Sequence, residues 1–363
     1  MGHKQFMKKN IQGVLKEVYA DLTLLPNSSP KIEAENIVKF LFQAIPFNHN
    51  YFSKRLYQTL FWKKDPEFLA IVVNEFQRVS QILLKILQQS TDEVQKELCE
   101  LVLGLIVSFY PFMEPLPSSL RIPQKINGAW QDIQYSVEKL ELTPQWLTSP
   151  LTAYGLTSSD ADSLLLFKGT PQSTAAGSFL SLWTDLVPGF MVGELAFRFF
   201  AKKEIKNWLD KQRSVKIHGH SLGGSLALLT ACYLPEKITE VHAYSPPGLF
   251  ARAINTFNGR PKVAVYWQKG DLVPLLGSGF HPDFQLYKIS CIEKTQGLFF
   301  GHIRTIPALS YVKVEEVLPS SEKRRVARFL FNSLHIAFSI LMFPVLTLIL
   351  FFRMLINFIK RDV

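Results

Sequence analysis

The sequence contains few of the residues that form covalent or metal cross-links. Among 363 residues there are only three cysteines: Cys99, Cys232 and Cys291. Their number and spacing exclude a disulfide scaffold and match no metal-ligand pattern, so we expect buried, reduced thiols. Charged residues make up only 19% of the chain and apolar residues 47%. This balance excludes global disorder and allows a sizeable core.

The first residues lack the apolar stretch of a secretory signal peptide. Gly2 stands where N-myristoylation occurs, but Phe6 replaces the Ser or Thr of that motif. Neither export nor lipidation is therefore predicted from this end, and we expect the folded part of the chain to face the cytosol.

The net charge of +10 is concentrated at the two ends of the chain. Residues 1–64 carry +6 and residues 323–363 also carry +6, whereas residues 65–322 carry −2. A nucleic-acid-binding protein more often has a basic face on its folded domain, so no nucleic-acid partner is expected. Basic ends beside an apolar segment indicate an anionic membrane surface as a partner.

Three regions are predicted: a helical region over 1–125, an α/β domain over 126–322 and a basic-flanked segment over 323–363. Pro66 opens the first clear helical pattern, and the sequence from Ser90 to Glu93 resembles a capping box that opens the next. Four prolines between residues 111 and 125 predict a linker.

Beyond residue 150, short apolar runs alternate with helix-like stretches over 190–210 and 222–234. Strands that alternate with helices predict an α/β fold with a mostly parallel sheet. The expected strands are Ser163–Phe167, Val215–His218, Val241–Tyr244, Val263–Trp267 and Phe284–Ile289.

Residues 329–352 form the longest uncharged run, with 24 residues. At about 1.5 Å per residue such a helix crosses a hydrocarbon core of about 30 Å, so we predict a membrane segment. Asn332, His335 and Pro344 inside the run leave a buried soluble helix open as an alternative. A hairpin kinked at Pro344 is another alternative, because basic residues flank both ends.

The strongest chemical signal is Gly-x-Ser-x-Gly over 219–223. An expected strand precedes Ser221 and an expected helix follows it, which is the context of a nucleophile elbow. Gly219 and Gly223 allow the flanking segments to approach each other, and the Leu222 amide is placed to stabilise an oxyanion.

A serine nucleophile needs a base and an acid that orients the base. Asp271 follows the strand 263–267 at its carboxyl end and is the predicted acid. His302 and His281 both follow Asp271. We favour His302 as the base because it follows the next strand, and His281 stays open as an alternative.

These segments resemble the class 3 (fungal-type) lipase family of α/β-hydrolases. The motif around Ser221 matches its nucleophile motif, 270–274 resembles its Asp-x-Val-Pro segment, and 164–170 resembles its oxyanion strand. The resemblance assigns Thr170 to the oxyanion hole and strengthens His302 as the base. It covers residues 160–305, with Lys168 in place of the family's Arg.

The resemblance implies a serine hydrolase that cleaves carboxylic esters of lipids, without a metal or organic cofactor. The apolar run 329–352 adds the expectation that this enzyme is membrane-associated. An acyltransferase or thioesterase with the same triad is one alternative, and an inactive membrane adaptor on a hydrolase fold is another. The apolar stretch 179–200 is expected to be either a lid or an ordinary packing helix. Head group, acyl length and protein partners are not indicated.

Overall fold

The computed structural model describes residues 66–91, 93–143, 151–169, 190, 192–268, 270–291, 312–317 and 322–359. Within these residues the chain forms one nine-stranded mixed sheet whose strands lie side by side in sequence order. Strands β1 to β4 are antiparallel, β4 to β8 are parallel, and β9 returns antiparallel to β8. The strands are β1 (Ser119–Ile126), β2 (Ala129–Glu141), β3 (Thr152–Thr157), β4 (Ser163–Phe167), β5 (Val215–His220), β6 (Ile238–Tyr244), β7 (Lys262–Gln268), β8 (Gln285–Cys291) and β9 (Val312–Glu316).

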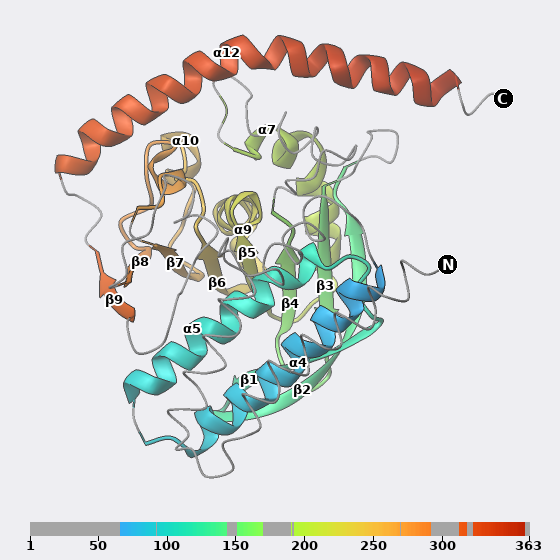
Figure 1. Ribbon diagram of the computed structural model, residues 1–363, viewed down its shortest axis with the longest axis vertical. Helices are drawn as coiled ribbons and strands as arrows, with labels where there is room; N and C mark the ends of the chain where they lie inside the picture. The colour runs from blue at the N-terminus through green and yellow to red at the C-terminus, as the bar shows by residue number, and fades with distance from the viewer. Residues whose placement is uncertain are drawn as a thin grey trace, which may run out of the picture.

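Helices cover both faces of this sheet, so the fold has three layers (Figure 1). On one face α4 (Pro66–Gln89) packs on β1 and β2, and α5 (Glu93–Phe109) packs on β4, β5 and β6. On the other face α8 (Lys202–Leu209) and α9 (Leu222–Tyr233) contribute buried side chains to a second core. The shorter helices are α7 (Glu194–Ala196), the π-helix η2 (Phe197–Ala201), α10 (Ala251–Ile254) and the 3-10 turns η1 (Tyr110–Phe112), η3 (Pro235–Lys237) and η4 (Val273–Leu275).

The alternation of side chains along each strand explains the two cores. Ile217 of β5 points toward α9, whereas Leu164 of β4 and Tyr244 of β6 point toward α5. Parallel strands covered on both faces are apolar along their length, which is the pattern that the sequence shows over 163–167. The predicted α/β class and all five predicted strands are confirmed. The expectation of a mostly parallel sheet is wrong, because four of the eight pairings are antiparallel: those of β1 to β4 and that of β8 with β9.

The linker predicted over 111–125 is wrong in its second half, where β1 begins at Ser119. Pro123 lies inside β1 and faces Asp132 of β2. The proline is tolerated because β1 is an edge strand and needs hydrogen bonds on one side only. The domain boundary expected at 125/126 falls inside this strand, and α4 and α5 share a core with the sheet.

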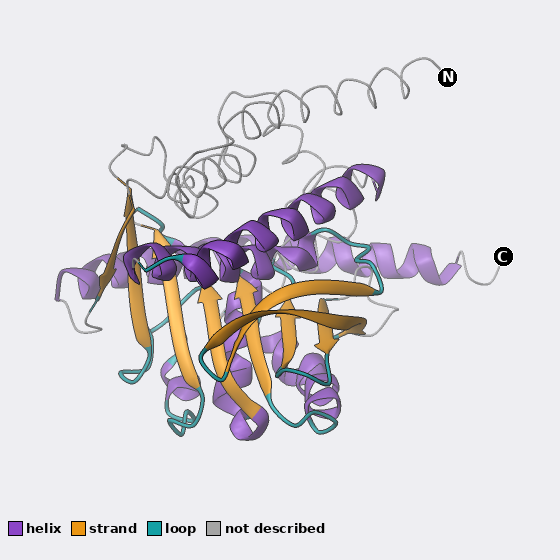
Figure 2. Cartoon of the chain, turned by 90° about the horizontal axis from the view of Figure 1, so that it is seen from below, coloured by secondary structure: helices purple, strands orange, loops and turns teal. Residues whose placement is uncertain are grey.

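The C-terminal segment forms one continuous helix, α12 (Glu322–Ile359), longer than the run 329–352. It contains the one candidate membrane span found among the described residues, Arg328–Val345, of which 6% is buried. A buried soluble helix therefore does not describe it, and because α12 continues through Pro344 it is not a hairpin. Figure 2 shows α12 crossing behind the upper ends of the parallel strands.

Candidate active site

Ser221 occupies the single position between β5 and α9. Its backbone angles are φ 57° and ψ −123°, and φ is positive in only three described residues that are not glycine. The Ser221 amide donates to the Tyr244 carbonyl at 2.9 Å, while the Ser221 carbonyl accepts from the Ser225 amide at 3.0 Å. The first bond extends the sheet and the second begins the helix, so the chain reverses direction within one residue.

Two glycines flank this turn where no side chain would fit. A Cβ atom on Gly219 would lie 2.2 Å from the Gly223 carbonyl oxygen. A Cβ atom on Gly223 would lie 2.3 Å from the Phe167 carbonyl oxygen and 3.1 Å from the Gly169 amide nitrogen. The glycines therefore bring the end of β4 against the first turn of α9.

Leu222 begins α9 directly after Ser221, and its side chain is buried. Its amide belongs to the first turn of the helix, where backbone N–H groups lack intrahelical acceptors. Thr170, the other predicted oxyanion residue, lies outside the described residues. Its neighbour Gly169 is described, and a Cβ atom there would lie 2.6 Å from the His220 carbonyl oxygen.

Asp271 follows β7 at the carboxyl edge of the sheet, two strands away from Ser221. Its side chain is buried, and its Oδ1 accepts a hydrogen bond from the Val273 amide at 3.0 Å. The Asp271 amide donates to the Gln268 carbonyl at 3.0 Å. These two bonds fix the carboxylate in a turn at the edge that also carries Ser221.

The two candidates for the histidine base, His302 and His281, lie in different parts of the chain relative to β8. His302 lies outside the described residues, in the connection between β8 and β9. His281 lies four residues before β8, with its ring centroid 4.9 Å from that of Phe257 and 5.7 Å from that of Phe284. Its Nδ1 accepts from the Asp283 amide at 3.1 Å. His281 precedes a strand, whereas Ser221 and Asp271 each follow one.

Lys168, at the end of β4, makes a part-buried ion pair that ties three elements together. Glu114 accepts from Lys168 Nζ at 2.7 Å and lies 2.6 Å from Lys139 Nζ of β2. Burial raises the pKa of the Glu114 carboxyl, but Lys168 and Lys139 more than offset this and lower it to about 2. The charged form is therefore the stable one at neutral pH.

The histidines that flank the elbow have packing contacts. The His220 ring lies 4.9 Å from the Phe109 ring of α5. His218 is stacked on His242 of the next strand at 4.8 Å, and burial, with the nearby His242 and Lys216, holds its pKa well below the usual value. Both histidines therefore attach the sheet to α5 or to the neighbouring strand.

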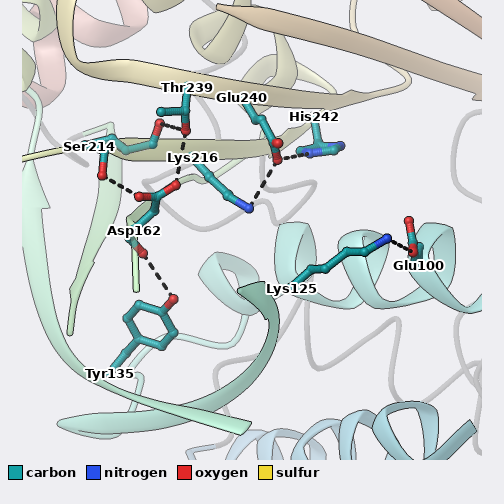
Figure 3. Close-up of polar contacts among 10 residues, drawn as sticks. Glu100, Lys125, Tyr135, Asp162, Ser214, Lys216, Thr239, Glu240 and His242 are labelled. Atoms are coloured by element: carbon teal, nitrogen blue, oxygen red, sulfur yellow. Dashed lines mark hydrogen bonds and ion pairs between the residues drawn. The ribbon is translucent and has the colours of Figure 1, made fainter. Parts of the chain in front are cut away.

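A cavity with a volume of about 900 Å³ lies on the α5 side of the sheet. Figure 3 shows Lys216 and His242 directed at Glu240 on its wall, and Lys125 directed at Glu100. Neither Ser221 nor Asp271 lines this cavity. The cavity is therefore separate from the edge of the sheet that carries Ser221 and Asp271.

Two residues near Asp271 were not assigned to the site from the sequence. Arg328 and Asn332 of α12 hydrogen-bond to the loop that follows Asp271. A small cavity of about 40 Å³ is lined by Asp271, Trp267, Pro274, Leu275, Phe280, Leu286 and Arg328. The sequence signal was Asn332 itself, a polar residue inside a long apolar run.

Comparisons with known proteins agree with the sequence motifs. The family model described as Lipase (class 3) matches residues 156–278. A triacylglycerol lipase from Penicillium expansum is similar in structure with a TM-score of 0.32 and 14% identity, over 48% of this chain and 84% of that one. A predicted CIB-like hydrolase from Thermoplasma acidophilum has a TM-score of 0.28 and 14% identity, over 55% and 99%. No curated protein matches the chain.

Proposed function

We propose that the chain hydrolyses carboxylic ester bonds of lipids, because residues 156–278 match the model of the class 3 lipase family. Ser221 is the nucleophile, His302 the general base and Asp271 the acid that orients the base. Thr170 and the Leu222 amide form the oxyanion hole. The reaction needs no metal or organic cofactor, because the triad and the amides supply both the nucleophile and the charge stabilisation.

In the proposed mechanism Ser221 Oγ attacks the ester carbonyl carbon while His302 takes the hydroxyl proton. The carbonyl oxygen becomes an oxyanion held by the Leu222 amide and Thr170. His302 then gives its proton to the leaving alcohol, and an acyl-serine remains. Water, deprotonated by His302, attacks this acyl group and releases the fatty acid and free Ser221.

The observation that carries the proposal is the backbone of Ser221. A serine with φ 57° and ψ −123° between a parallel strand and a helix is strained, and structures retain such strain mainly at functional sites. The turn exposes the hydroxyl above the carboxyl edge of the sheet, beside the amides of the first turn of α9.

The order of the elements supports His302 over His281. The nucleophile follows β5 and the acid follows β7, so the next connection at the same edge is the one after β8, which contains His302. His281 instead precedes β8 and packs against Phe257 and Phe284. A base must reach within about 3 Å of Ser221 Oγ. The aromatic contacts of His281 give it a packing role instead.

We further propose that the enzyme acts at an anionic membrane surface, with α12 as the membrane-binding element and the catalytic domain on the cytosolic side. The basic flanks at 323–325 and 360–361 favour anionic lipids. For the stretch 179–200, the described part favours packing over a lid, because Phe197 is buried in the core that contains α9.

The test is labelling of the full chain with a fluorescent fluorophosphonate, together with release of fatty acid from phospholipid and triacylglycerol emulsions. His302→Ala should reduce labelling and hydrolysis by at least about 10³-fold, a typical effect of losing a triad base. His281→Ala serves as the matched control and should retain both activities.

The alternatives give different results in the same assays. Labelling with acyl transfer to an added alcohol or thiol, in place of fatty acid release, would indicate an acyltransferase or thioesterase. No labelling of the wild type under conditions that label a control lipase would contradict the proposal and favour an inactive adaptor. Loss of activity in H281A but not in H302A would reverse the assignment of the base.

A further inference from the structure

The polar residues of the first half of α12 lie on one face, and that face lies against the catalytic domain. Arg328, Asn332, His335 and Ser339 follow one another at intervals of four, three and four residues, which places them on one stripe of a helix. Ser339 is fully buried and the other three are partly buried. The helix therefore turns its polar side inward.

Specific hydrogen bonds hold this polar stripe to the loop after Asp271. Asn332 Oδ1 accepts from the Gly277 amide at 2.8 Å, and Asn332 Nδ2 donates to the Gly277 carbonyl at 2.9 Å. One turn earlier, Arg328 Nη1 donates to the Ser278 carbonyl at 2.5 Å. The first turns of α12 are thus bonded to the edge of the sheet that carries Ser221 and Asp271.

The opposite side of α12 is apolar and exposed, the reverse of a helix on a soluble protein. Leu334 is 68% exposed and Leu341 is 69% exposed. The large exposed apolar side chains of α12 are Phe329, Leu330, Leu334, Ile336, Phe338, Ile340, Leu341, Val345, Leu348, Phe351 and Phe352. An apolar surface of this extent on the outside of a protein marks an interaction site.

The length of α12 does not leave enough free helix to cross a bilayer. Residues 328–339 are held against the catalytic domain by the polar stripe, so a crossing segment would begin after them. From residue 340 to Arg353 there are 13 uncharged residues, about 20 Å of helix, against a hydrocarbon core of about 30 Å. A perpendicular span that began earlier would pull Asn332 and its bonded loop into the hydrocarbon.

We propose that α12 is a monotopic helix that lies in the plane of one leaflet. Its apolar face enters the acyl region, its polar stripe stays on the catalytic domain, and the basic residues at both ends contact anionic headgroups. This arrangement holds the carboxyl edge of the sheet, with Ser221 and Asp271, at the membrane surface. The inference rests on the membrane association in the proposed function, and it replaces the single span by an in-plane helix.

Depth measurement in a bilayer tests this geometry without using activity as the readout. The full chain carries Cys291→Ser, because Cys99 and Cys232 are already buried. An environment-sensitive fluorophore is attached to one introduced cysteine at a time: L334C, L341C, L348C or F352C. The protein is reconstituted into vesicles of phosphatidylcholine and phosphatidylserine with bromine at defined depths of the acyl chains. Lys211→Cys, exposed at the amino edge of the sheet, is the unquenched control.

An in-plane helix predicts that all four positions lie at one shallow depth, about 5–10 Å below the headgroup boundary. A perpendicular span predicts depths that change by up to about 27 Å from residue 334 to residue 352, and a hairpin predicts a maximum near Pro344. Either of these profiles, or the absence of quenching at every position, overturns the proposal.

A second set of variants separates this result from the fate of the proposed function. Replacing Leu334, Leu341 and Leu348 by Gln should release the protein from vesicles, whereas fluorophosphonate labelling of Ser221 in solution should persist. Full vesicle binding by this triple variant would also overturn the in-plane helix. Loss of labelling in the wild type, with a flat depth profile, would instead refute the hydrolase and leave the membrane geometry in place.

Discussion

Ser221 holds a backbone conformation that its neighbours enforce. Residues in such sparsely populated regions cost about 1–3 kcal/mol each. The elbow retains this conformation because the Ser221 amide is bonded to β6, its carbonyl is bonded to α9, and the flanking glycines let β4 approach. The strained conformation of Ser221 therefore depends on the close contacts that Gly219 and Gly223 allow. We expect a side chain at either glycine to disturb the conformation of Ser221.

Gly223→Ala tests this coupling. Its new methyl group would lie 2.3 Å from the Phe167 carbonyl oxygen, so β4 or α9 must move. We expect the free energy of unfolding to fall by about 2 kcal/mol or more and fluorophosphonate labelling to be lost. Urea unfolding followed by circular dichroism measures the first effect, and gel fluorescence measures the second.

Gly224→Ala is the matched control in the same helix turn. Its methyl group would lie 3.0 Å from the Pro246 Cβ and 3.2 Å from the Gly219 carbonyl oxygen, which is tight but less severe than the 2.3 Å contact at Gly223. We expect a smaller loss of stability and retained labelling. Equal effects of the two substitutions would contradict a special role for the contact between Gly223 and Phe167.

At the residue scale, the sequence predicted Ser221 and Asp271 at strand ends because motif and apolar pattern agree there. The local pattern is sufficient because an elbow is built from consecutive residues. His302 and Thr170 stay predictions, since both lie outside the described residues. The contacts of Asn332 with Gly277 were not predictable, because 55 residues separate them and no local pattern encodes that approach.

An ion-pair cluster of Glu114, Lys168 and Lys139 connects several elements near the candidate site. This cluster connects η1, the end of β4 and β2. Because the end of β4 leads to Thr170, the ion pair anchors the strand that precedes the proposed oxyanion loop.

Glu114→Gln should lower the free energy of unfolding at pH 7 by on the order of 2 kcal/mol, because it removes the part-buried carboxylate that Lys139 and Lys168 share. The folded-state pKa of about 2 lies below the ordinary value of 4.5, so the stabilisation is full above about pH 4.5. It is lost as pH falls from 4.5 toward 2. Urea titrations of both proteins from pH 7 to pH 3 should show the difference shrinking; a constant difference would contradict this assignment.

Asn332→Ala tests the contact between α12 and the loop that follows Asp271. Losing the acceptor of the Gly277 amide, at a cost of about 1–1.5 kcal/mol, should speed hydrogen exchange at this amide about tenfold. Ser333→Ala is the control, because the Ser333 hydroxyl bonds only within the helix, to the Phe329 carbonyl. Unchanged exchange at Gly277 in N332A would mean that the helix does not hold this loop.

At the element scale, the five strands of the α/β core were predicted because each is a short apolar run covered on both faces. Strands β1, β2, β3 and β9 were not. Strands β1 and β2 carry many polar residues and have many exposed positions, whereas β3 is buried but contains Thr152, Gly155 and Thr157, which interrupt the apolar run. The four prolines before and within β1 also indicated a linker. An edge position, which depends on tertiary structure, is what allows Pro123 in a strand.

At the scale of the whole molecule, binding to an anionic membrane would account both for the basic ends of the chain and for the exposed position of α12. The basic excess lies at the two ends, and one of them brackets the exposed apolar helix. In the proposed arrangement the apolar face of α12 supplies membrane affinity, while the basic flanks select anionic lipid.

Replacing Lys323, Arg324 and Arg325 by Gln should weaken binding to phosphatidylserine-containing vesicles by about 10²-fold, from about 1 kcal/mol per basic residue. Binding to pure phosphatidylcholine should change little. Replacing Lys211, Arg213 and Arg260 by Gln removes the same charge from exposed positions before β5 and β7, and is the control with no expected effect. Vesicle sedimentation measures both. Equal losses on the two vesicle types would contradict a role in headgroup recognition.

The central claim is that Ser221 forms the covalent intermediate. The most direct test is mass spectrometry of the fluorophosphonate adduct on the full chain, with Ser221→Ala and the exposed loop variant Ser159→Ala beside the wild type. The account predicts one adduct, on the peptide that contains Ser221, present in the wild type and S159A and absent from S221A. An adduct on another residue, or labelling that persists in S221A, would contradict it.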